Sequence, residues 1–371
     1  MRILLAITSL GVGGAERLVT ALADRYAAAG HQVMLIWFHG EAELRPSDPR
    51  VRLENLNMRR SPLGVLVAMR RFRRFVRVFG PDVVNTHLLH ANLLTRLLRL
   101  VTPMPRLVSS AHNTNEEGRG RMLAYRLTDR LVDISTNVSE EAVAAFVAQG
   151  ALKPDRMLPI HNGIDTESFA YSPAARAQVR AELGLEETTP LLMAVGRLCE
   201  PKDYPNLLRA FASLDAGVVP PQLVIVGGGP LRRDLGMLAD SLNVAHRVRF
   251  LGVRHDVPAL MSACDLFVLS SAWEGFGLVV AEAMACRRPV VATDCGGVRE
   301  VVGDAGFLVP PRDAQVLKEV MRRVLHLPEE QRERLGTIAR ERVLARYSLD
   351  AMAQKYLAVY RGIREGPHAA E

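Results

Sequence analysis

The stretch DLFVLSSAWEGFGLVVAEAMACRRPVVAT, residues 265–293, decides the fold. Its first and last parts, DLFVLSS and RPVVAT, are short apolar runs typical of buried strands, and an apolar helical pattern lies between them. The stretch therefore predicts a strand–helix–strand unit of a parallel sheet. Two carboxylates, Glu274 and Glu282, stand in this apolar segment with seven residues between them. Because burying an unpaired charge is costly, the two acids are candidates for binding a ligand.

The same alternation runs along the rest of the chain. The first half contains the candidate strands RILLAI, QVMLIWF, VRLENL, DVVNTH, RLVSSAH, DISTNVS and MLPIHNG, and the second half contains PLLMAVGR, QLVIVGGG, RVRFLG, DLFVLSS, RPVVAT and GFLVPP. The stretch NGIDTESFAYSPAAR (162–176) interrupts the pattern and is interpreted as a linker, and the tail from about Gln315 to Ile363 is expected to be helical throughout. We expect two Rossmann-like, doubly wound α/β domains, 1–165 and 166–346, facing each other across a cleft, with ligands at the carboxyl ends of the strands.

Composition limits the class of protein. The chain of 371 residues is 49% hydrophobic and 23% charged, which is typical of a globular protein, and its net charge of +7 favours anionic partners. No apolar run reaches the roughly 18 residues that a membrane span needs, and the N-terminal apolar run is short enough to be a strand rather than a signal peptide. The cysteines, Cys199, Cys264, Cys286 and Cys295, form no C-x-x-C pair, so we expect reduced thiols in a cytosolic protein.

Two glycine-rich turns follow predicted strands. Gly11, Gly13 and Gly14 follow the first strand, and Gly227, Gly228 and Gly229 stand in VIVGGGPLRRDL. Glycine lets a ligand approach the backbone, and helix amino ends attract anions. The first turn has Glu16 where a dinucleotide fingerprint has glycine, and no acidic residue closes the following strand QVMLIWFHG. An NAD-dependent dehydrogenase is therefore disfavoured.

A diphosphate site is suggested by AVGRLCEPKDYPNLLRAF. Arg197 comes directly after a strand that ends at Gly196, and Lys202 precedes the next helix. Two cations beside a helix amino end suit a diphosphate. The alternative is two solvated surface cations. Nearby, one of Glu274 and Glu282 could hold sugar hydroxyls and the other ribose hydroxyls.

At this point EGFGLVVAE resembles the Glu-seven-Glu motif of the retaining glycosyltransferases of family 4. The motifs GGAE, AHN, HNGID, GRLCEPK, VGGGP, the pair Leu251–Gly252 and TDCGGVREVV follow the family pattern in order. The resemblance implies the GT-B fold, with the acceptor on the first domain and the nucleotide sugar on the second. It also implies a C-terminal helix, about 347–364, that crosses back to the first domain. In one departure, Cys199 and Glu200 precede Lys202 where small residues are usual, and the glycine usual after the lysine is missing.

The resemblance also implies the site. Arg197 and Lys202 would bind the diphosphate, Glu274 the donor sugar and Glu282 the ribose, and His112 would lie near the reacting ring; Arg197, Lys202, Glu274 and His112 form the catalytic set. The donor-binding set is Gly13, Gly14, Gly196, Gly227, Gly228, Val253, Arg254, Gly275, Phe276, Gly277, Leu278 and Glu282, with Glu16 and Asn113 on the acceptor side. The alternatives are a helix acid at Glu282 and a strand-end histidine at His112.

The expected reaction cleaves the anomeric C–O bond of a nucleotide-diphosphate sugar. Arg197, Lys202 and the backbone N–H groups from Gly275 to Gly277 would stabilise the leaving group. The sequence contains no Asp-x-Asp pair, so we expect neither a metal nor a cofactor, and we favour a UDP-sugar over GDP-mannose. Front-face attack is preferred to Glu274 as a covalent nucleophile.

The stretch PLGVLVAMRRFRRFVRVFGPD (62–82) predicts an amphipathic helix ended by Pro81. Its apolar face contains Val65, Ala68, Met69, Phe72, Phe75, Val76 and Phe79, and its basic face contains Arg70, Arg71, Arg73, Arg74 and Arg77. Two interpretations stay open: a helix packed on the core with a solvated basic face, or a basic face that docks on anionic lipid. Nucleic-acid binding is disfavoured because few aromatic residues lie among the arginines.

The sequence therefore predicts a cytosolic retaining glycosyltransferase. If the basic helix docks on lipid, the protein would be peripheral on the inner face of the plasma membrane. Its acceptor would be a glycan or a polyprenyl-diphosphate-linked or lipopolysaccharide-core glycan of surface polysaccharide synthesis. Two alternatives remain: a nucleotide-sugar 2-epimerase of the same fold, and a non-catalytic nucleotide-sugar binder or membrane scaffold.

Overall fold

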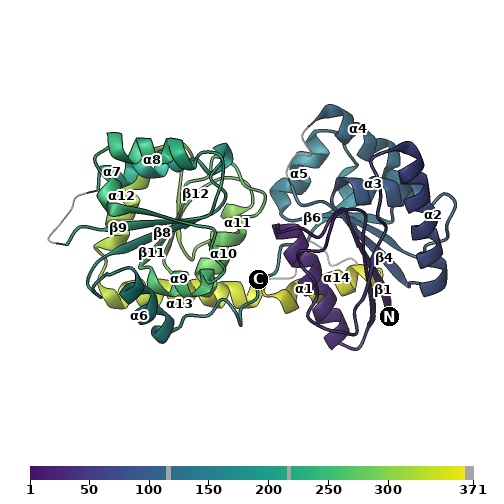
Figure 1. Cartoon of the computed structure of the whole chain (residues 1–371), viewed down its shortest axis with the longest axis horizontal. Helices are drawn as coiled ribbons and strands as arrows, with labels where there is room; N and C mark the ends of the chain where they lie inside the picture. The colour runs from purple at the N-terminus through teal and green to yellow at the C-terminus, as the bar shows by residue number, and fades with distance from the viewer. Residues whose placement is uncertain (114–117, 215–218, 364–371) are drawn as a thin grey trace. The chain divides into compact units, whose positions relative to one another are not determined.

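The computed structural model describes residues 1–113, 118–214 and 219–363, and it divides into two compact units. Unit 1 comprises Met1–Gly163 and Leu349–Glu371, and unit 2 comprises Ile164–Ser348. Each unit is a parallel β-sheet covered by helices (Figure 1). Every strand predicted from the sequence is present.

Unit 1 contains a seven-stranded parallel sheet with the order β3-β2-β1-β4-β5-β6-β7. The strands are β1 (Arg2–Ile7), β2 (Gln32–Trp37), β3 (Arg52–Asn55), β4 (Val83–His87), β5 (Leu107–Ser110), β6 (Ile134–Asn137) and β7 (Met157–Pro159). The helices are α1 (Gly14–Ala28), α2 (Pro62–Phe79), α3 (Leu89–Leu98), α4 (Arg119–Thr128), α5 (Glu140–Ala148) and α14 (Leu349–Tyr360). The winding direction reverses between β1 and β4.

Helix α14 packs in the core of unit 1, although the whole of unit 2 precedes it in the sequence. Its buried side chains share one apolar cluster with α1 and the sheet. Its two tyrosines also enter a buried polar network: Asn85 donates to the Tyr360 hydroxyl at 2.7 Å, and Tyr356 lies 3.3 Å from the Ser110 hydroxyl. This confirms the expected C-terminal helix that returns to the first domain.

Helix α2 covers the opposite face of the unit 1 sheet together with α3. Ser61 caps its amino end by accepting from the backbone N–H of Gly64, and Gly80, in the left-handed conformation with a φ of 57°, ends it. Ala68, Phe72 and Val76 are buried against the sheet, as the predicted apolar face requires.

Unit 2 contains a six-stranded parallel sheet with the order β10-β9-β8-β11-β12-β13. The strands are β8 (Leu191–Val195), β9 (Gln222–Val226), β10 (Val248–Gly252), β11 (Leu266–Leu269), β12 (Val290–Thr293) and β13 (Phe307–Val309). The helices are α6 (Pro173–Glu182), α7 (Tyr204–Ala212), α8 (Arg232–Ser241), α9 (Val257–Ala263), α10 (Leu278–Ala285), α11 (Val298–Val302), α12 (Ala314–Leu325) and α13 (Glu329–Arg346). One face of the sheet is covered by α7, α8 and α12.

Two predictions about the ends of elements were wrong. The stretch 162–176 is not a linker to its end, because Ser172 caps α6 and Pro173 begins that helix. The tail is not one continuous helix, because it breaks between α12 and α13, where Pro328 lies, and again at Tyr347 and Ser348 before α14.

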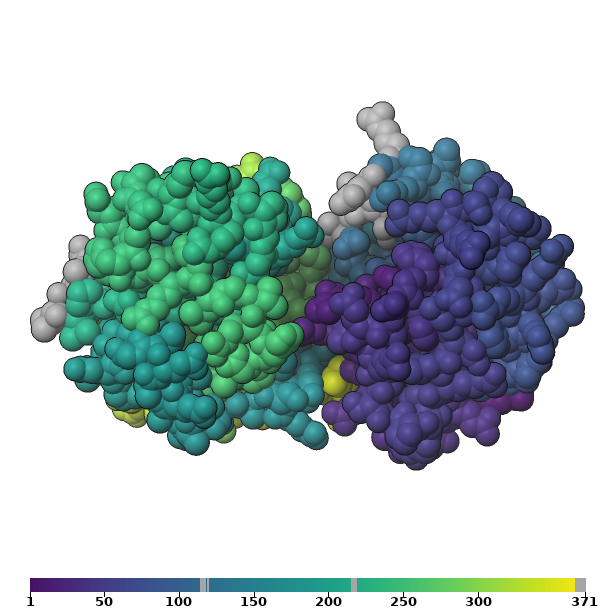
Figure 2. All heavy atoms as spheres, viewed as in Figure 1, coloured from purple at the N-terminus to yellow at the C-terminus, as the bar shows by residue number. Residues whose placement is uncertain are grey.

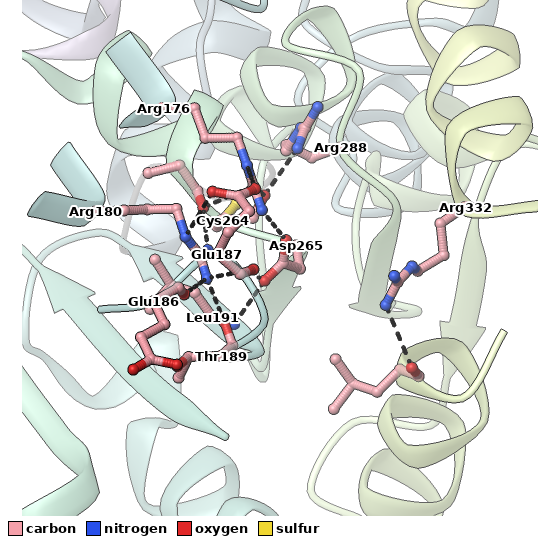
Figure 3. A network of polar contacts seen from close by, with 12 residues as sticks. Arg176, Arg180, Glu186, Glu187, Thr189, Leu191, Cys264, Asp265, Arg288 and Arg332 are labelled. Atoms are coloured by element: carbon pink, nitrogen blue, oxygen red, sulfur yellow. Dashed lines mark hydrogen bonds and ion pairs between the residues drawn. The ribbon is translucent and has the colours of Figure 1, made fainter. Parts of the chain in front are cut away.

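A charged network ties the amino ends of β8 and β11 together (Figure 3). Asp265 accepts from the backbone N–H of Leu191 at 2.8 Å and pairs with Arg176 at 2.8 Å. The buried Arg180 donates to the carbonyl oxygens of Glu186, Glu187 and Thr189. This network occupies the amino edge of the sheet, so the carboxyl edge is the edge that can bind a ligand.

We expect Tyr360→Phe to destabilise unit 1. The change leaves the buried amide of Asn85 without its acceptor, which costs about 1–3 kcal/mol and lowers the melting temperature by about 2–12 °C. Scanning calorimetry measures the shift. Tyr171→Phe in unit 2, where the tyrosine ring packs under Arg288, is the matched control. Equal melting temperatures for the two variants would contradict the role given to the Tyr360 hydroxyl.

Candidate functional site

The candidate site of unit 2 lies where the winding of its sheet reverses, between β8 and β11. The loop after β8 leads to α7 on one face of the sheet, whereas the loop after β11 leads to α10, which packs with α9, α11 and α13. Two loops that leave neighbouring strands toward opposite faces expose the sheet edge between them. Arg197 and Lys202 follow β8, and Glu274 follows β11.

An ion pair joins the two loops. The Lys202 Nζ donates to Glu274 Oε1 at 2.5 Å, and the Ser271 hydroxyl donates to the same oxygen at 2.7 Å. The backbones are tied as well, since the Ser270 hydroxyl donates to the Lys202 carbonyl at 2.9 Å and the Ala272 N–H to the Pro201 carbonyl at 2.8 Å. The structure therefore brings two of the predicted catalytic residues into direct contact.

Tyr204, the first residue of α7, lies beside this ion pair. It is buried, and its hydroxyl donates to the carbonyl of Gly196 at 3.1 Å. Burial, with the Glu274 carboxylate as a second cause, raises the pKa of Tyr204 well above its usual value. Tyr204 is thus a neutral phenol beside the ion pair. Tyr204 was not predicted as a site residue from the sequence, although it lies two residues after Lys202.

The predicted glycines permit close contact between backbones. A Cβ on Gly227 would lie 2.0 Å from the carbonyl oxygen of Gly196, and the φ of Gly227 is 136°. A Cβ on Gly296 would lie 1.8 Å from the carbonyl oxygen of Glu274. Gly228, by contrast, has only a methyl group of Val253 at 3.3 Å. Packing between the loops thus accounts for the glycine at 227, whatever ligand binds there.

The predicted donor-binding residues around the start of α10 differ in their environment. Gly277, with a φ of 84°, ends the loop, and no side chain of the described residues caps the helix that begins at Leu278. Phe276 is buried and packs edge-on against Tyr347, with ring centroids 5.5 Å apart, so its ring belongs to the core of unit 2. Glu282 is half-buried in the second turn of α10, and its contact with ribose stays a prediction.

The remaining donor-site residues of unit 2 lie at the same edge of the sheet. Arg197 is exposed in the loop after β8, and Val253 is 70% exposed after β10. The guanidinium of Arg254 is held by Asp256 at 2.6 Å and by Glu182 at 2.9 Å. Because these ion pairs hold the side chain, the predicted donor contact of Arg254 would come from its backbone.

In unit 1 the first glycine turn leads into α1. Gly13 is the N-cap residue in extended conformation, and Gly14 is the first residue of the helix. The carboxylate of Glu16 folds back over Gly13, where a Cβ would lie 2.3 Å from Oε2, and the Ser9 hydroxyl lies 3.5 Å from Oε1. Glu16 therefore lies at the amino end of α1, at the carboxyl edge of the unit 1 sheet.

His112, two residues beyond β5, contacts His87, which was not predicted as a site residue from the sequence. Its Nε2 lies 3.0 Å from Nδ1 of His87, the last residue of β4. Burial lowers the pKa of His112 to about 4 and the pKa of His87 well below its usual value, so both rings are neutral. The signal was present, because DVVNTH ends at His87 on the strand next to β5. Asn113 is exposed, and its carbonyl accepts from Asn137 at 3.0 Å.

The predicted basic face of α2 divides in two. Arg71 is exposed but donates to the carbonyl of Leu56 at 3.1 Å, and Arg73 is half-buried. Arg70, Arg74 and Arg77 are exposed. In the described part of the chain no helix is long and apolar enough to cross a bilayer, and no group of three or more metal-ligating side chains is present.

We expect Gly227→Ala to destabilise unit 2 because the new Cβ would overlap the Gly196 carbonyl in a backbone conformation that alanine avoids. A cost of about 2–4 kcal/mol lowers the melting temperature by about 4–16 °C. Gly228→Ala is the matched control and should change it by less than about 4 °C. A smaller shift for Gly227→Ala than for Gly228→Ala would contradict this packing.

Comparisons with known proteins agree with this architecture. A family model described as Glycosyltransferase Family 4 matches residues 12–168, and one described as Glycosyl transferases group 1 matches residues 175–342. The chain is 24% identical over 377 residues to N-acetyl-alpha-D-glucosaminyl L-malate synthase of Bacillus anthracis, covering 97% of both chains. It is 35% identical over 198 residues to alpha-D-kanosaminyltransferase of Streptomyces kanamyceticus, and this match spans 52% of the chain and about half, 51%, of that relative.

Among solved structures, HepE of Anabaena in complex with UDP matches with a TM-score of 0.84 and 23% identity, covering 98% of this chain and 100% of that one. A likeness at this identity establishes the shared fold. The two family matches together account for most of the chain, and they fall on the two units that the contacts define. The chain belongs to the family 4 glycosyltransferases, and its fold is GT-B.

Proposed function

We propose that this glycosyltransferase moves a sugar from a UDP-sugar, with retention of anomeric configuration, to a glycan or lipid-linked glycan of surface polysaccharide synthesis. The observation that carries the proposal is the Lys202–Glu274 pair at the reversal point of the unit 2 sheet. Complexes of HepE with UDP and with UDP-glucose support a uridine nucleotide as the donor. The retaining outcome rests on the family resemblance.

In this proposal Lys202 binds the diphosphate of the donor and Glu274 binds the hydroxyls of its sugar. The Lys202 ammonium has three donors and gives one to Glu274, so the others are available to the oxygens of a diphosphate. On Glu274, Oε1 accepts both Lys202 and Ser271, and Oε2 is left to accept sugar hydroxyls. Arg197, exposed in the adjoining loop, would add a second cation to the diphosphate.

This arrangement favours front-face attack. The negative charge of a carboxylate is shared by both oxygens, so the ammonium and the hydroxyl bound at Oε1 make the whole group, including Oε2, a weaker nucleophile than an unpaired carboxylate. Glu274 is therefore suited to orienting the sugar, and the departing diphosphate, stabilised by Lys202 and Arg197, would take the proton of the acceptor hydroxyl.

We expect UDP to raise the melting temperature more than GDP, ADP or dTDP do, because a ligand that binds only the folded state stabilises it.

Glu274→Gln should lower kcat by about a hundredfold or more while the Kd of UDP changes less than about threefold, since the diphosphate keeps Lys202. Glu200→Gln, an exposed carboxylate in the same loop, is the control. Calorimetry measures the Kd of UDP, and a transfer assay measures kcat. If Glu274→Gln weakened UDP binding as much as it slowed turnover, the role given to Glu274 would be contradicted.

Retention is tested separately by NMR of the product. An α-configured donor should give an α-configured glycoside, and a β-configured product would exclude this part of the proposal. An epimerised sugar nucleotide formed in the absence of acceptor would favour the epimerase alternative.

The proposal also includes a membrane-docking surface on α2. The outward side of this helix carries Leu63, Leu66 and Val67 in its first turns, exposed by 69%, 47% and 47%, and Arg70, Arg74 and Arg77 further along. Figure 2 shows the atoms of this segment, coloured dark blue, on the surface of unit 1. Apolar side chains beside arginines suit the interface of an anionic bilayer.

We expect the protein to sediment with vesicles that contain phosphatidylglycerol and not with pure phosphatidylcholine vesicles. At about 1 kcal/mol for each arginine, the triple variant Arg70→Gln, Arg74→Gln, Arg77→Gln should bind about a hundredfold more weakly. The control carries the same charge change at Arg209, Arg233 and Arg334, exposed residues of unit 2. An equal loss in both triple variants would mean that net charge, not α2, determines binding.

A further inference from the structure

The strongest unassigned feature is the contact between two imidazoles, the buried His87 and the half-buried His112, at the carboxyl edge of the unit 1 sheet. His87 is fully buried at the end of β4, between the ring of His112, with centroids 5.3 Å apart, and the ring of Tyr356 on α14, with centroids 6.3 Å apart. Only one hydrogen bond joins the two histidines, from Nδ1 of His87 to Nε2 of His112. Among the predicted catalytic residues, the one to which the structure joins His87 by a hydrogen bond is His112, its neighbour within unit 1, so we expect any effect of His87 on catalysis to act through His112.

A hydrogen bond between two neutral imidazoles has one donor and one acceptor. If His112 donated, His87 would carry its proton on Nε2. That atom is buried and has no hydrogen-bond partner among the described residues. If His87 donated, the same Nε2 would be an unprotonated acceptor. A buried N–H without an acceptor is rarer and costlier than a buried acceptor without a donor, so the second arrangement is favoured.

We infer that His87 is a positioning residue that fixes the tautomer of His112. His87 donates from Nδ1 to Nε2 of His112, and the proton of His112 therefore resides on its own Nδ1. This makes His112 an N–H donor toward an oxygen of the bound donor sugar, and it excludes His112 as the base that receives the acceptor proton. The place of His112 beside the sugar rests on the proposed function, whereas its tautomer rests on the geometry of unit 1 alone.

The tautomer can be read without any substrate. Long-range ¹H–¹⁵N correlation spectra of the full chain, labelled with ¹⁵N-histidine, distinguish a protonated Nδ1 from a protonated Nε2. The signals of His112 are those absent from the His112→Gln variant. We expect a protonated Nδ1 in the unliganded protein. A protonated Nε2 on His112 would overturn the inference.

The positioning role is tested with two amide variants. In His87→Asn the amide nitrogen falls near the place of Nδ1 and can still donate to His112, whereas in His87→Gln it falls near the place of Nε2 and cannot. We expect His87→Asn to keep kcat within about threefold of the wild type. His87→Gln should lose about tenfold or more in kcat, the equivalent of one lost hydrogen bond, with a smaller change in the KM of the donor.

The two substitutions remove a ring and introduce an amide alike, so a merely structural role for His87 would make them equally harmful. Equal losses in variants that melt at the same temperature would overturn the positioning role. If the wild type transfers no sugar from any donor, the proposed function fails, and the NMR experiment still decides the tautomer. If His112→Gln transfers at the wild-type rate, the role of His112 at the sugar fails, and the tautomer stands.

Discussion

The whole candidate donor site depends on the position of β8 in the unit 2 sheet. The chain winds outward from β8 to β9 and β10, then returns to place β11 on the other side of β8. The loops after β8 and β11 are therefore far apart in sequence and adjacent in space, and the Lys202–Glu274 ion pair joins one loop to the other. The opposite edge of the same two strands is occupied by Arg176, Arg180 and Asp265, which leaves the carboxyl edge as the place for chemistry.

Much of this could be predicted from the sequence because it depends on local patterns. Short apolar runs gave the strands, and a strand end followed by a cation or a carboxylate gave Lys202 and Glu274. The sequence could not predict which side chains at the ends of different strands contact one another. The ion pair joins residues 72 positions apart, and the His87–His112 contact depends on β4 lying beside β5. On α2, helical periodicity assigned the apolar residues to the core and passed over Leu63, Leu66 and Val67 on the opposite side.

The two units share one electrostatic design. In unit 2 the buried, neutral Tyr204 lies beside the charged Lys202–Glu274 pair, and in unit 1 the buried, neutral His87 lies behind His112. In both places burial keeps the deeper group uncharged; His87 contacts His112 directly, whereas Tyr204 donates to the Gly196 carbonyl beside the ion pair. Such preorganised polar groups need not rearrange when charge develops on a ligand.

The position of α14 has a consequence for biosynthesis. A ribosome completes all seven strands of unit 1 before it begins unit 2, yet the apolar surface of α1 and the sheet that α14 covers stays open until the last helix emerges. At about 5–20 residues per second, translating Ile164–Ser348 takes roughly ten to forty seconds. The nascent chain therefore carries an incomplete first domain for at least that interval.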